Sequence, residues 1–384
     1  MEDADAKERD DALLERHRPI LRFDPQYDYR VLAADSAVEN PGNILRRFDG
    51  EVIARAGGQP PLSFALLGAY PPDLAPRADD SIAMGPDHIG DARRMESDPD
   101  LNGRLYGRVV ADGSRTFLQY WFWLYYNPKN LLGVGKHEGD WEMVQVGIGA
   151  SGEPEVATYA QHDSGEARRW RPGEIEVWAA DPRRPVVYVA PLSHASYFEP
   201  YTHPYVLGID HPYAGGPAAD LPVVGFGPWI GWGGHWGSID RRIARGLGGG
   251  PRSPSRQGIK WERPGAWHDR MSRRRWRSVI GRAMHRAGSL TYPAAPRISV
   301  RGIEDGRVRV AWELQGAGVR RERHLQITLH DRHLVIASRI VQDAAGRGET
   351  SLPVPVARTA TTVMASAYNR LRQRGDVVQA PVGP

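Results

Sequence analysis

The chain contains no cysteine, which excludes a disulfide framework, a thiolate metal site and a thiol nucleophile. It also has no long apolar run, since none approaches the roughly 18 residues that a membrane-spanning helix needs. The N-terminus, Met1–Asp11, is acidic and polar and lacks the basic and apolar regions of a secretory signal. We therefore expect a soluble chain that is cytoplasmic by default. Export by a route that needs no such signal stays open.

Lysine is nearly absent and occurs only at Lys7, Lys129, Lys136 and Lys260, so almost all positive charge is arginine. The net charge of +4 is too weak to indicate a nucleic-acid partner, and we expect none. The 43 glycines and 31 prolines indicate many turns and few long helices. All 12 tryptophans lie between Trp121 and Trp312, which predicts that the largest core is in the middle of the chain.

A length of 384 residues predicts two domains. We expect a mainly β protein in which a large β-sandwich with long loops and one or two helices precedes a small immunoglobulin-like or fibronectin type III-like β-sandwich. The predicted boundaries are 1–17 for a polar N-terminal tail, helical or disordered, 18–265 for the large sandwich, 266–290 for a basic amphipathic connecting helix and 291–384 for the small sandwich.

The strand pattern is clearest in the middle of the chain. Leu105–Val110 and Thr116–Tyr126 flank an Asp-Gly pair, which is typical of a hairpin, and the second arm is apolar on both faces. Other strand-like runs are Trp141–Ile148, Glu155–Gln161, Glu174–Trp178, Val186–Ala190, Arg297–Ile303, Arg307–Leu314, Leu325–Leu329, Leu334–Val341 and Thr361–Tyr368. Short strands at this spacing predict sandwiches or barrels. The stretch from 24 to about Asp100 predicts only irregular packing.

Two other segments have distinct patterns. Residues 205–265 carry many glycines and scattered tryptophans, including those of Gly227–Gly237, which predicts a long ordered loop packed by its aromatic rings. Trp267–Ala287 is the strongest predicted helix, with apolar residues on one face and arginines on the other. A basic amphipathic helix can contact a membrane surface, but anchoring helices usually lie at a terminus, so docking on the sandwich is favoured.

The stretch Lys136–Val146 carries the candidate chemistry. If Trp141 begins a strand, Asp140 and Glu142 point to the same face, and His137 can fold back toward them. Two carboxylates and an imidazole form part of a site for a divalent cation, Mg or Ca first and Mn or Zn as alternatives. The alternative is a solvated strand end whose acids pair with some of the many arginines.

Two further histidines end predicted strands: His162 follows Ala157–Gln161 and His194 follows Val186–Leu192. Loops at strand ends present functional groups, so either could act as a catalytic acid or base. A lone histidine in such a place is more often a structural hydrogen-bonding group. Ser193 is no serine nucleophile paired with His194, because adjacent residues of an extended chain point to opposite faces.

The segment Lys136–Glu142 resembles the signature of the vacuolar protein sorting-associated 62 family. It is also similar, more remotely, to the Gly-His-Arg-His-Asp-Trp-Glu heptad of microbial necrosis-inducing proteins. Further family-like stretches lie within about residues 15–270, namely Arg18–Phe23, Tyr120–Pro128, Tyr159–His162, Val187–Tyr197, Trp229–Gly237 and Gly250–Pro254.

The resemblance implies a β-sandwich that holds a divalent cation and, in the necrosis-inducing proteins, engages sphingolipid glycan heads. Carried over by position, the metal ligands are His137, Asp140 and Glu142. Gly139 stands where the heptad has its second histidine, and the cysteines of the secreted relatives are absent. Asn127 and Asn130 are the nearest candidates for the upstream acidic ligand.

Three functions remain open on this sequence. The first is cation-dependent binding of a glycan or glycolipid head group, with tryptophan and tyrosine rings stacking on the ligand. The second is metal-dependent hydrolysis of a glycan or phosphoester, with His162 or His194 transferring the proton. The third is a structural or trafficking role in which the ion only stabilises the sandwich. Peripheral membrane contact and a protein partner for the C-terminal domain also remain open.

Overall fold

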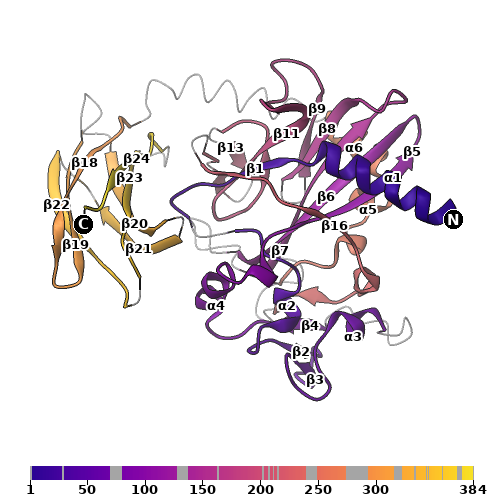
Figure 1. Cartoon of the computed structure of the whole chain (residues 1–384), viewed down its shortest axis with the longest axis horizontal. Coiled ribbons are helices and arrows are strands. Elements are labelled where there is room, and N and C mark those ends of the chain that lie inside the picture. The colour runs from indigo at the N-terminus through magenta and orange to yellow at the C-terminus, as the bar shows by residue number, and fades with distance from the viewer. Residues whose placement is uncertain are drawn as a thin grey trace.

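The computed structural model describes residues 2–383 except 28–29, 70–79, 128–136, 162–163, 201–202, 206–207, 211, 214–215, 239–248, 274–292, 315–321, 333, 343, 345, 357 and 370–373. The fold is mainly β, and two β-rich parts lie side by side (Figure 1). The described helices are α1 (Glu2–His17), α2 (Ser36–Glu39), α3 (Phe64–Gly68), α4 (His88–Met95), α5 (Ile259–Glu262), α6 (Pro264–Ser272) and the 3-10 turns Pro99–Leu101, Pro228–Gly231 and Pro254–Arg256. None of the described helices is long and apolar enough to cross a membrane.

A six-stranded sheet forms the centre of the large domain. Its order is β16 (Val223–Gly225), β5 (Leu105–Asp112), β6 (Arg115–Asn127), β7 (His137–Ile148), β8 (Pro154–Gln161) and β9 (Ser164–Arg169). The predicted hairpin is confirmed, because Ala111 pairs with Thr116 across a turn in which Gly113 has a φ of +67°. β6 is buried on both faces, as its sequence predicts. β7 begins at His137, four residues before the predicted start.

A second sheet covers one face of the first and completes the predicted sandwich. It contains β10 (Val177–Trp178), β11 (Asp181–Val189), β1 (Ile20–Arg22) and β15 (Ala218–Ala219), and β12 (Ser196–Tyr197) pairs with β11. Leu118, Tyr120 and Phe122 of β6 meet Leu21 of β1 and Val187 of β11 in the core between the sheets. The helix α1 packs against the same core through Leu14, so residues 2–17 belong to the sandwich.

The opposite face of the central sheet carries a compact aromatic layer. We call Trp121, Trp123, Trp141, Trp229, Trp232 and Trp236 the tryptophan cluster; all six side chains are buried. The rings of Trp123 and Trp141 lie 5.2 Å apart, and Trp141 and Trp236 lie 5.4 Å apart. The prediction of a loop packed by its aromatic rings is therefore confirmed for the described part of 227–237.

The segment before Asp100 is more regular than predicted. It forms a small sheet in the order β17 (His235–Trp236), β4 (Ser81–Ala83), β2 (Ile44–Arg46) and β3 (Val52–Arg55), which lies at the lower edge of the domain in Figure 1. Strands of two to four residues leave too little periodicity to recognise. A two-stranded hairpin, β13 (His203–Tyr205) and β14 (Gly208–Asp210), was also missed. Of the predicted helix Trp267–Ala287, α6 is described, and residues 274–292 lie outside the described residues.

The C-terminal part is a second β-sandwich. One sheet has the order β18 (Arg297–Glu304), β19 (Arg307–Glu313) and β22 (Arg347–Pro353), and the other has β21 (Leu334–Gln342), β20 (Glu322–Asp331), β23 (Thr362–Asn369) and β24 (Val378–Pro381). Alternating residues such as Val308, Ile327 and Val363 fill the core between them. The sandwich prediction is confirmed, whereas the narrower fibronectin type III assignment stays a prediction.

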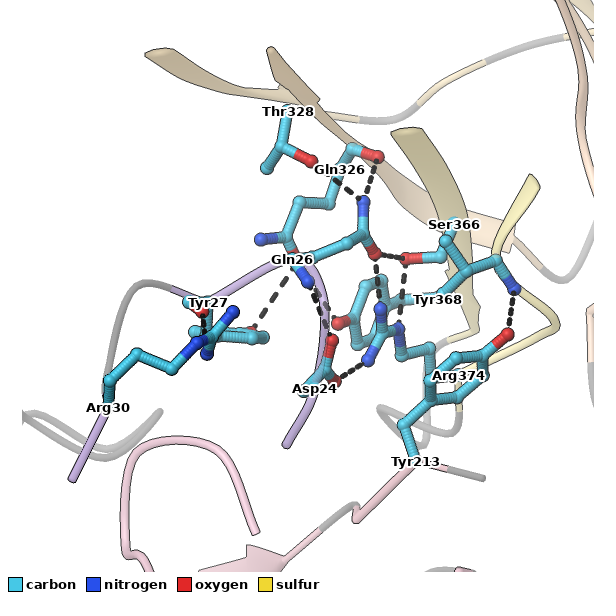
Figure 2. Close-up of polar contacts among 11 residues, drawn as sticks. Asp24, Gln26, Tyr27, Arg30, Tyr213, Gln326, Thr328, Ser366, Tyr368 and Arg374 are labelled. Atoms are coloured by element: carbon cyan, nitrogen blue, oxygen red, sulfur yellow. Dashed lines mark hydrogen bonds and ion pairs between the residues drawn. The ribbon is translucent and has the colours of Figure 1, made fainter. Parts of the chain in front are cut away.

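The outer face of the four-stranded sheet is polar and docks against the large domain. Gln326, Thr328 and Ser366 are buried there, with exposures of 7%, 0% and 0%. Gln26 of the large domain donates to the Gln326 carbonyl and to the Thr328 hydroxyl and accepts from Ser366 (Figure 2). An ion pair between Arg374 and Asp24 lies in the same contact. We call this set of polar contacts the interdomain lock.

His330, on the same face, makes the fold sensitive to acid. Burial, followed by the positive charge of Arg30, lowers the pKa of His330 to about 4 from its usual 6.5. The pKa of His330 is lower in the folded state than in the unfolded state. The contribution of neutral His330 to the free energy of unfolding is therefore complete above pH 6.5 and is lost as the pH falls toward 4. We expect a loss of about 3 kcal/mol from this residue. Denaturant unfolding at pH 7 and pH 4 should show a smaller acid loss in His330→Gln; equal losses would contradict the account.

Candidate functional site

The strand β7 places the two predicted carboxylates by its alternation. Trp141 and Met143 face the tryptophan cluster, so Asp140 and Glu142 face the interior of the sandwich. Their exposed fractions are 7% each. Neither carboxylate forms an ion pair with arginine or lysine within the described residues, so the predicted alternative of a solvated, arginine-paired strand end is wrong for this part of the chain.

His194 reaches Asp140 from the loop that follows β11. Its Nδ1 lies 3.0 Å from Oδ2 of Asp140, and the imidazole is 1% exposed. The loop holds Leu192 at φ +74° and His194 at φ +56°, and both are non-glycine residues in the left-handed region. Such conformations cost about 1–3 kcal/mol each and collect at functional sites. The structure thus brings together two of the predicted site residues.

Negative charge accumulates around Glu142. Burial, followed by the negative charge of Asp140, raises the pKa of the Glu142 carboxyl well above its usual range, and Asp210 adds to the rise. Lys260 acts in the opposite direction. Asp210, 3% exposed, accepts a 2.6 Å hydrogen bond from the Tyr197 hydroxyl. Several buried carboxylates that lie this close together remain ionised only beside a compensating positive charge.

His137 is oriented by its own strand. Its Nδ1 lies 2.6 Å from the Gly139 carbonyl oxygen, which only accepts, so Nδ1 carries the proton. Its Nε2 lies 2.8 Å from the amide nitrogen of Asn127, its cross-strand neighbour. A backbone carbonyl that fixes Nδ1–H is the usual way to aim Nε2 at a metal. An ion bound there would take the place of the Asn127 amide group.

Gly139 explains why the motif here departs from the necrosis-inducing heptad. Its φ is +66°, and a Cβ at this position would lie 2.2 Å from the Trp123 ring and 2.2 Å from the Trp236 carbonyl oxygen. A histidine side chain therefore does not fit at position 139 of this chain. The preceding residue, Glu138, accepts hydrogen bonds from the backbone and hydroxyl of Ser238 and from the Met84 backbone, so it anchors neighbouring loops.

Replacing Gly139 with alanine is expected to destabilise the fold by about 3 kcal/mol or more, because backbone strain and overpacking add. Gly113→Ala is the matched control: its φ is +67°, but nothing lies within 4 Å of the added Cβ, and we expect about 1 kcal/mol. Chemical denaturation of both variants measures the difference. Equal losses would show that the tryptophan cluster does not restrict position 139.

The donor chemistry of the site fits a hard cation, although its ligands are not pre-assembled. Carboxylates are the ligands that Mg and Ca prefer, and the buried Ser196 hydroxyl in β12, which packs on β7, has no hydrogen-bond partner in the described chain. Among the described residues, however, no three histidine or acidic side chains have the spacing of a metal site. His162 and Asn130 lie outside the described residues.

Three tryptophans of the segment 227–237 are buried and are not available to stack on a ligand. Trp229, Trp232 and Trp236 are 4%, 2% and 0% exposed and pack in the tryptophan cluster. This close packing agrees with the loop prediction, and the expectation that other tryptophan and tyrosine rings near the loops stack on a ligand stays a prediction. Asp210 was missed, since the β13–β14 hairpin brings it to the site from a segment with no local motif. Its partner Tyr197 lies in β12, within the family-like stretch Val187–Tyr197, but was not singled out as a site residue.

Comparisons with known proteins give a distant structural likeness. The chain matches no family model and no curated protein, so the resemblance to the vacuolar protein sorting-associated 62 family is not supported. Solved structures of necrosis and ethylene inducing proteins are similar. One is Necrosis and Ethylene inducing Protein 2 from the causal agent of cocoa's Witches Broom disease, at 13% identity, with 55% of this chain and 72% of that chain covered and a TM-score of 0.27.

Two further structures belong to the same group. The non-toxic HaNLP3 protein matches at 13% identity, covering 56% of this chain and 74% of that chain, with a TM-score of 0.30. NLPPya in complex with mannosamine matches at 13% identity and a TM-score of 0.22, and the match covers 32% of this chain and about half, 51%, of that chain. Similarity at these TM-scores carries no argument about ligand or activity.

Proposed function

We propose that the chain binds a divalent cation at the His137 end of β7 and uses the ion to bind a glycan or glycolipid head group. Asp140 and Glu142 supply carboxylate oxygens, and His137 supplies Nε2. The ion, when bound, offers positive charge to sugar hydroxyl or phosphate oxygens. The residues of the chain orient it: the Gly139 carbonyl holds the His137 ring, and His194 holds Asp140.

One observation carries this proposal: two adjacent carboxylates are buried on the sandwich face with no arginine or lysine ion pair in the described residues. Asp140 has a contact with His194, but burying a carboxylate such as Glu142 without an ion pair is strongly unfavourable, and the raised pKa of Glu142 reflects that cost. A divalent cation removes the cost and leaves coordination positions for a ligand. Mg or Ca suits the carboxylate donors, and the imidazole also admits Mn or Zn.

A panel of immobilised glycans and lipid head groups, probed with Ca or Mg and again with chelator, tests the proposal. We expect binding that needs the ion, that Asp140→Asn abolishes and that Glu155→Gln retains. Glu155 is an acid on the neighbouring strand β8 that pairs with Arg115 at the surface, which makes it the matched control. If the ion binds and raises the stability of the chain but no glycan or lipid head group binds, the result would support a role in which the ion only stabilises the sandwich. Chelator-insensitive binding would contradict the proposal.

A second candidate function is metal-dependent hydrolysis, favoured by the 3.0 Å contact between His194 and Asp140. A carboxylate that orients an imidazole is the arrangement used for proton transfer. In this case His194→Gln should abolish turnover of a glycan or phosphoester while leaving ion binding intact. Turnover that persists in His194→Gln would exclude this role for the residue.

A further inference from the structure

A cavity of about 430 Å³ lies between the two domains, beside the interdomain lock and apart from β7. The large domain contributes Arg30 and Tyr213 to its wall, and the C-terminal domain contributes His330, Arg332, Met364 and Gln379. We call it the interdomain pocket. Its volume falls within the range of small-molecule sites, roughly 300–1,000 Å³.

The wall of the pocket is positively charged. Arginines come from both domains, and no carboxylate is among the described lining residues. The charge of Arg30 reaches the pocket, because it contributes to the lowered pKa of His330. His330 is therefore neutral at pH 7 and bonds to the Thr328 hydroxyl at 2.9 Å. The negative charge of Asp376 reaches Tyr213 from outside the lining, so the charged groups of the lining itself are the two guanidinium groups. Arg332 forms no ion pair within the described residues.

The pocket is held in shape by its surroundings. The Tyr213 hydroxyl accepts a hydrogen bond from the Val377 backbone at 3.3 Å, and the Arg374 guanidinium lies 5.0 Å from the Tyr213 ring centre (Figure 2). Arg332 itself occupies a left-handed turn with φ +56°, and its backbone N–H donates to Thr361 at 2.8 Å. Asp331 pairs with Leu334 across this hairpin turn, where a positive φ is ordinary, so the turn fixes the backbone of Arg332 at the pocket wall.

We propose that the interdomain pocket binds a small phosphate ester, with the phosphate held between Arg30 and Arg332. One guanidinium fork satisfies both oxygens of a carboxylate, whereas two guanidinium groups contributed by different domains are satisfied together by an anion with more acceptor oxygens. A phosphate group provides them. Met364 gives the remainder of the ligand an apolar surface together with two prolines of the lining, Pro25 and Pro217. Tyr213 and Gln379 provide polar contacts.

Isothermal titration of the full chain with glucose 6-phosphate, inorganic phosphate and glucose tests the proposal. We expect saturable binding of the two phosphates and none of glucose. Arg332→Gln should weaken binding about tenfold or more, since a hydrogen bond to a charged group contributes about 1.5–3 kcal/mol. Met364→Trp, which fills the cavity without changing charge, should weaken binding in the same way.

Arg347→Gln is the matched control, because it removes the same charge from an exposed position on β22 of the same domain. Asp140→Asn should leave phosphate binding unchanged, which separates this site from the proposed cation site. Thermal unfolding of each variant shows that it is folded. Absence of saturable binding to the unmodified chain, equal weakening by Arg332→Gln and Arg347→Gln, or full binding in Met364→Trp would each overturn the proposal.

Discussion

Replacing Arg374 with alanine is expected to lower the free energy of unfolding by about 3–5 kcal/mol, because the change leaves a buried charge without its partner. Asp24 and Arg374 are 2% and 8% exposed, and Arg374 also donates to the Ser366 hydroxyl at 3.0 Å and to Gln26. These contacts join a loop of the large domain to the C-terminal sandwich. The loss should therefore separate the two domains as well as destabilise them.

Denaturant unfolding and small-angle scattering of Arg374→Ala measure the two effects. Arg347→Ala, at an exposed position, should stay within about 0.5 kcal/mol of the unmodified chain. The double variant Asp24→Asn with Arg374→Ala should recover part of the loss, because the unpaired carboxylate is then gone. An Arg374→Ala variant with unchanged stability and dimensions would show that the interdomain lock does not hold the domains together.

Replacing Glu142 with glutamine is expected to change stability in opposite directions with and without a divalent cation. Without the ion, glutamine removes a buried group that favours its neutral form and lies beside Asp140, so the variant should be the more stable protein. With Ca or Mg at about 100 times the dissociation constant, the unmodified chain should gain about 2.7 kcal/mol. The variant should gain much less.

Thermal or chemical unfolding of both proteins, in chelator and in excess Ca or Mg, measures this reversal. Glu155→Gln, on the exposed end of a neighbouring strand, should respond to the ion as the unmodified chain does. If Glu142→Gln is less stable than the unmodified chain in chelator, the carboxylate is already compensated within the protein and no cation is needed there.

Much of the fold follows from patterns in the sequence. The Asp-Gly turn and the apolar run Leu118–Tyr126 predict the β5–β6 hairpin and the buried inner strand. The alternation of Leu325, Ile327 and Leu329 predicts a core-facing strand in the C-terminal sandwich. The strands of the small sheet, such as β4 and β17, contain only two or three residues, so their pairing depends on tertiary contacts that no local pattern records.

The site was only partly predictable for a similar reason. Alternation along β7 places Asp140 and Glu142 on one face, and the strand-end position of His194 marks it as a candidate. The contact of His194 with Asp140 depends on the loop after β11, in which Leu192 and His194 have positive φ. The position of Asp210 depends on the β13–β14 hairpin. The docking of the C-terminal domain was also missed, because a polar outer sheet face such as Gln326 and Thr328 normally indicates exposure to solvent.

The most direct test of the account is the amount of metal bound to the purified chain after equilibration with Mg, Ca, Mn or Zn. We expect one bound divalent ion per chain in the unmodified protein and in Glu155→Gln, and loss of that ion in Asp140→Asn. An unmodified chain that binds no ion, or an Asp140→Asn variant that binds as much as the unmodified chain, would contradict the proposal that the acidic end of β7 is a cation site.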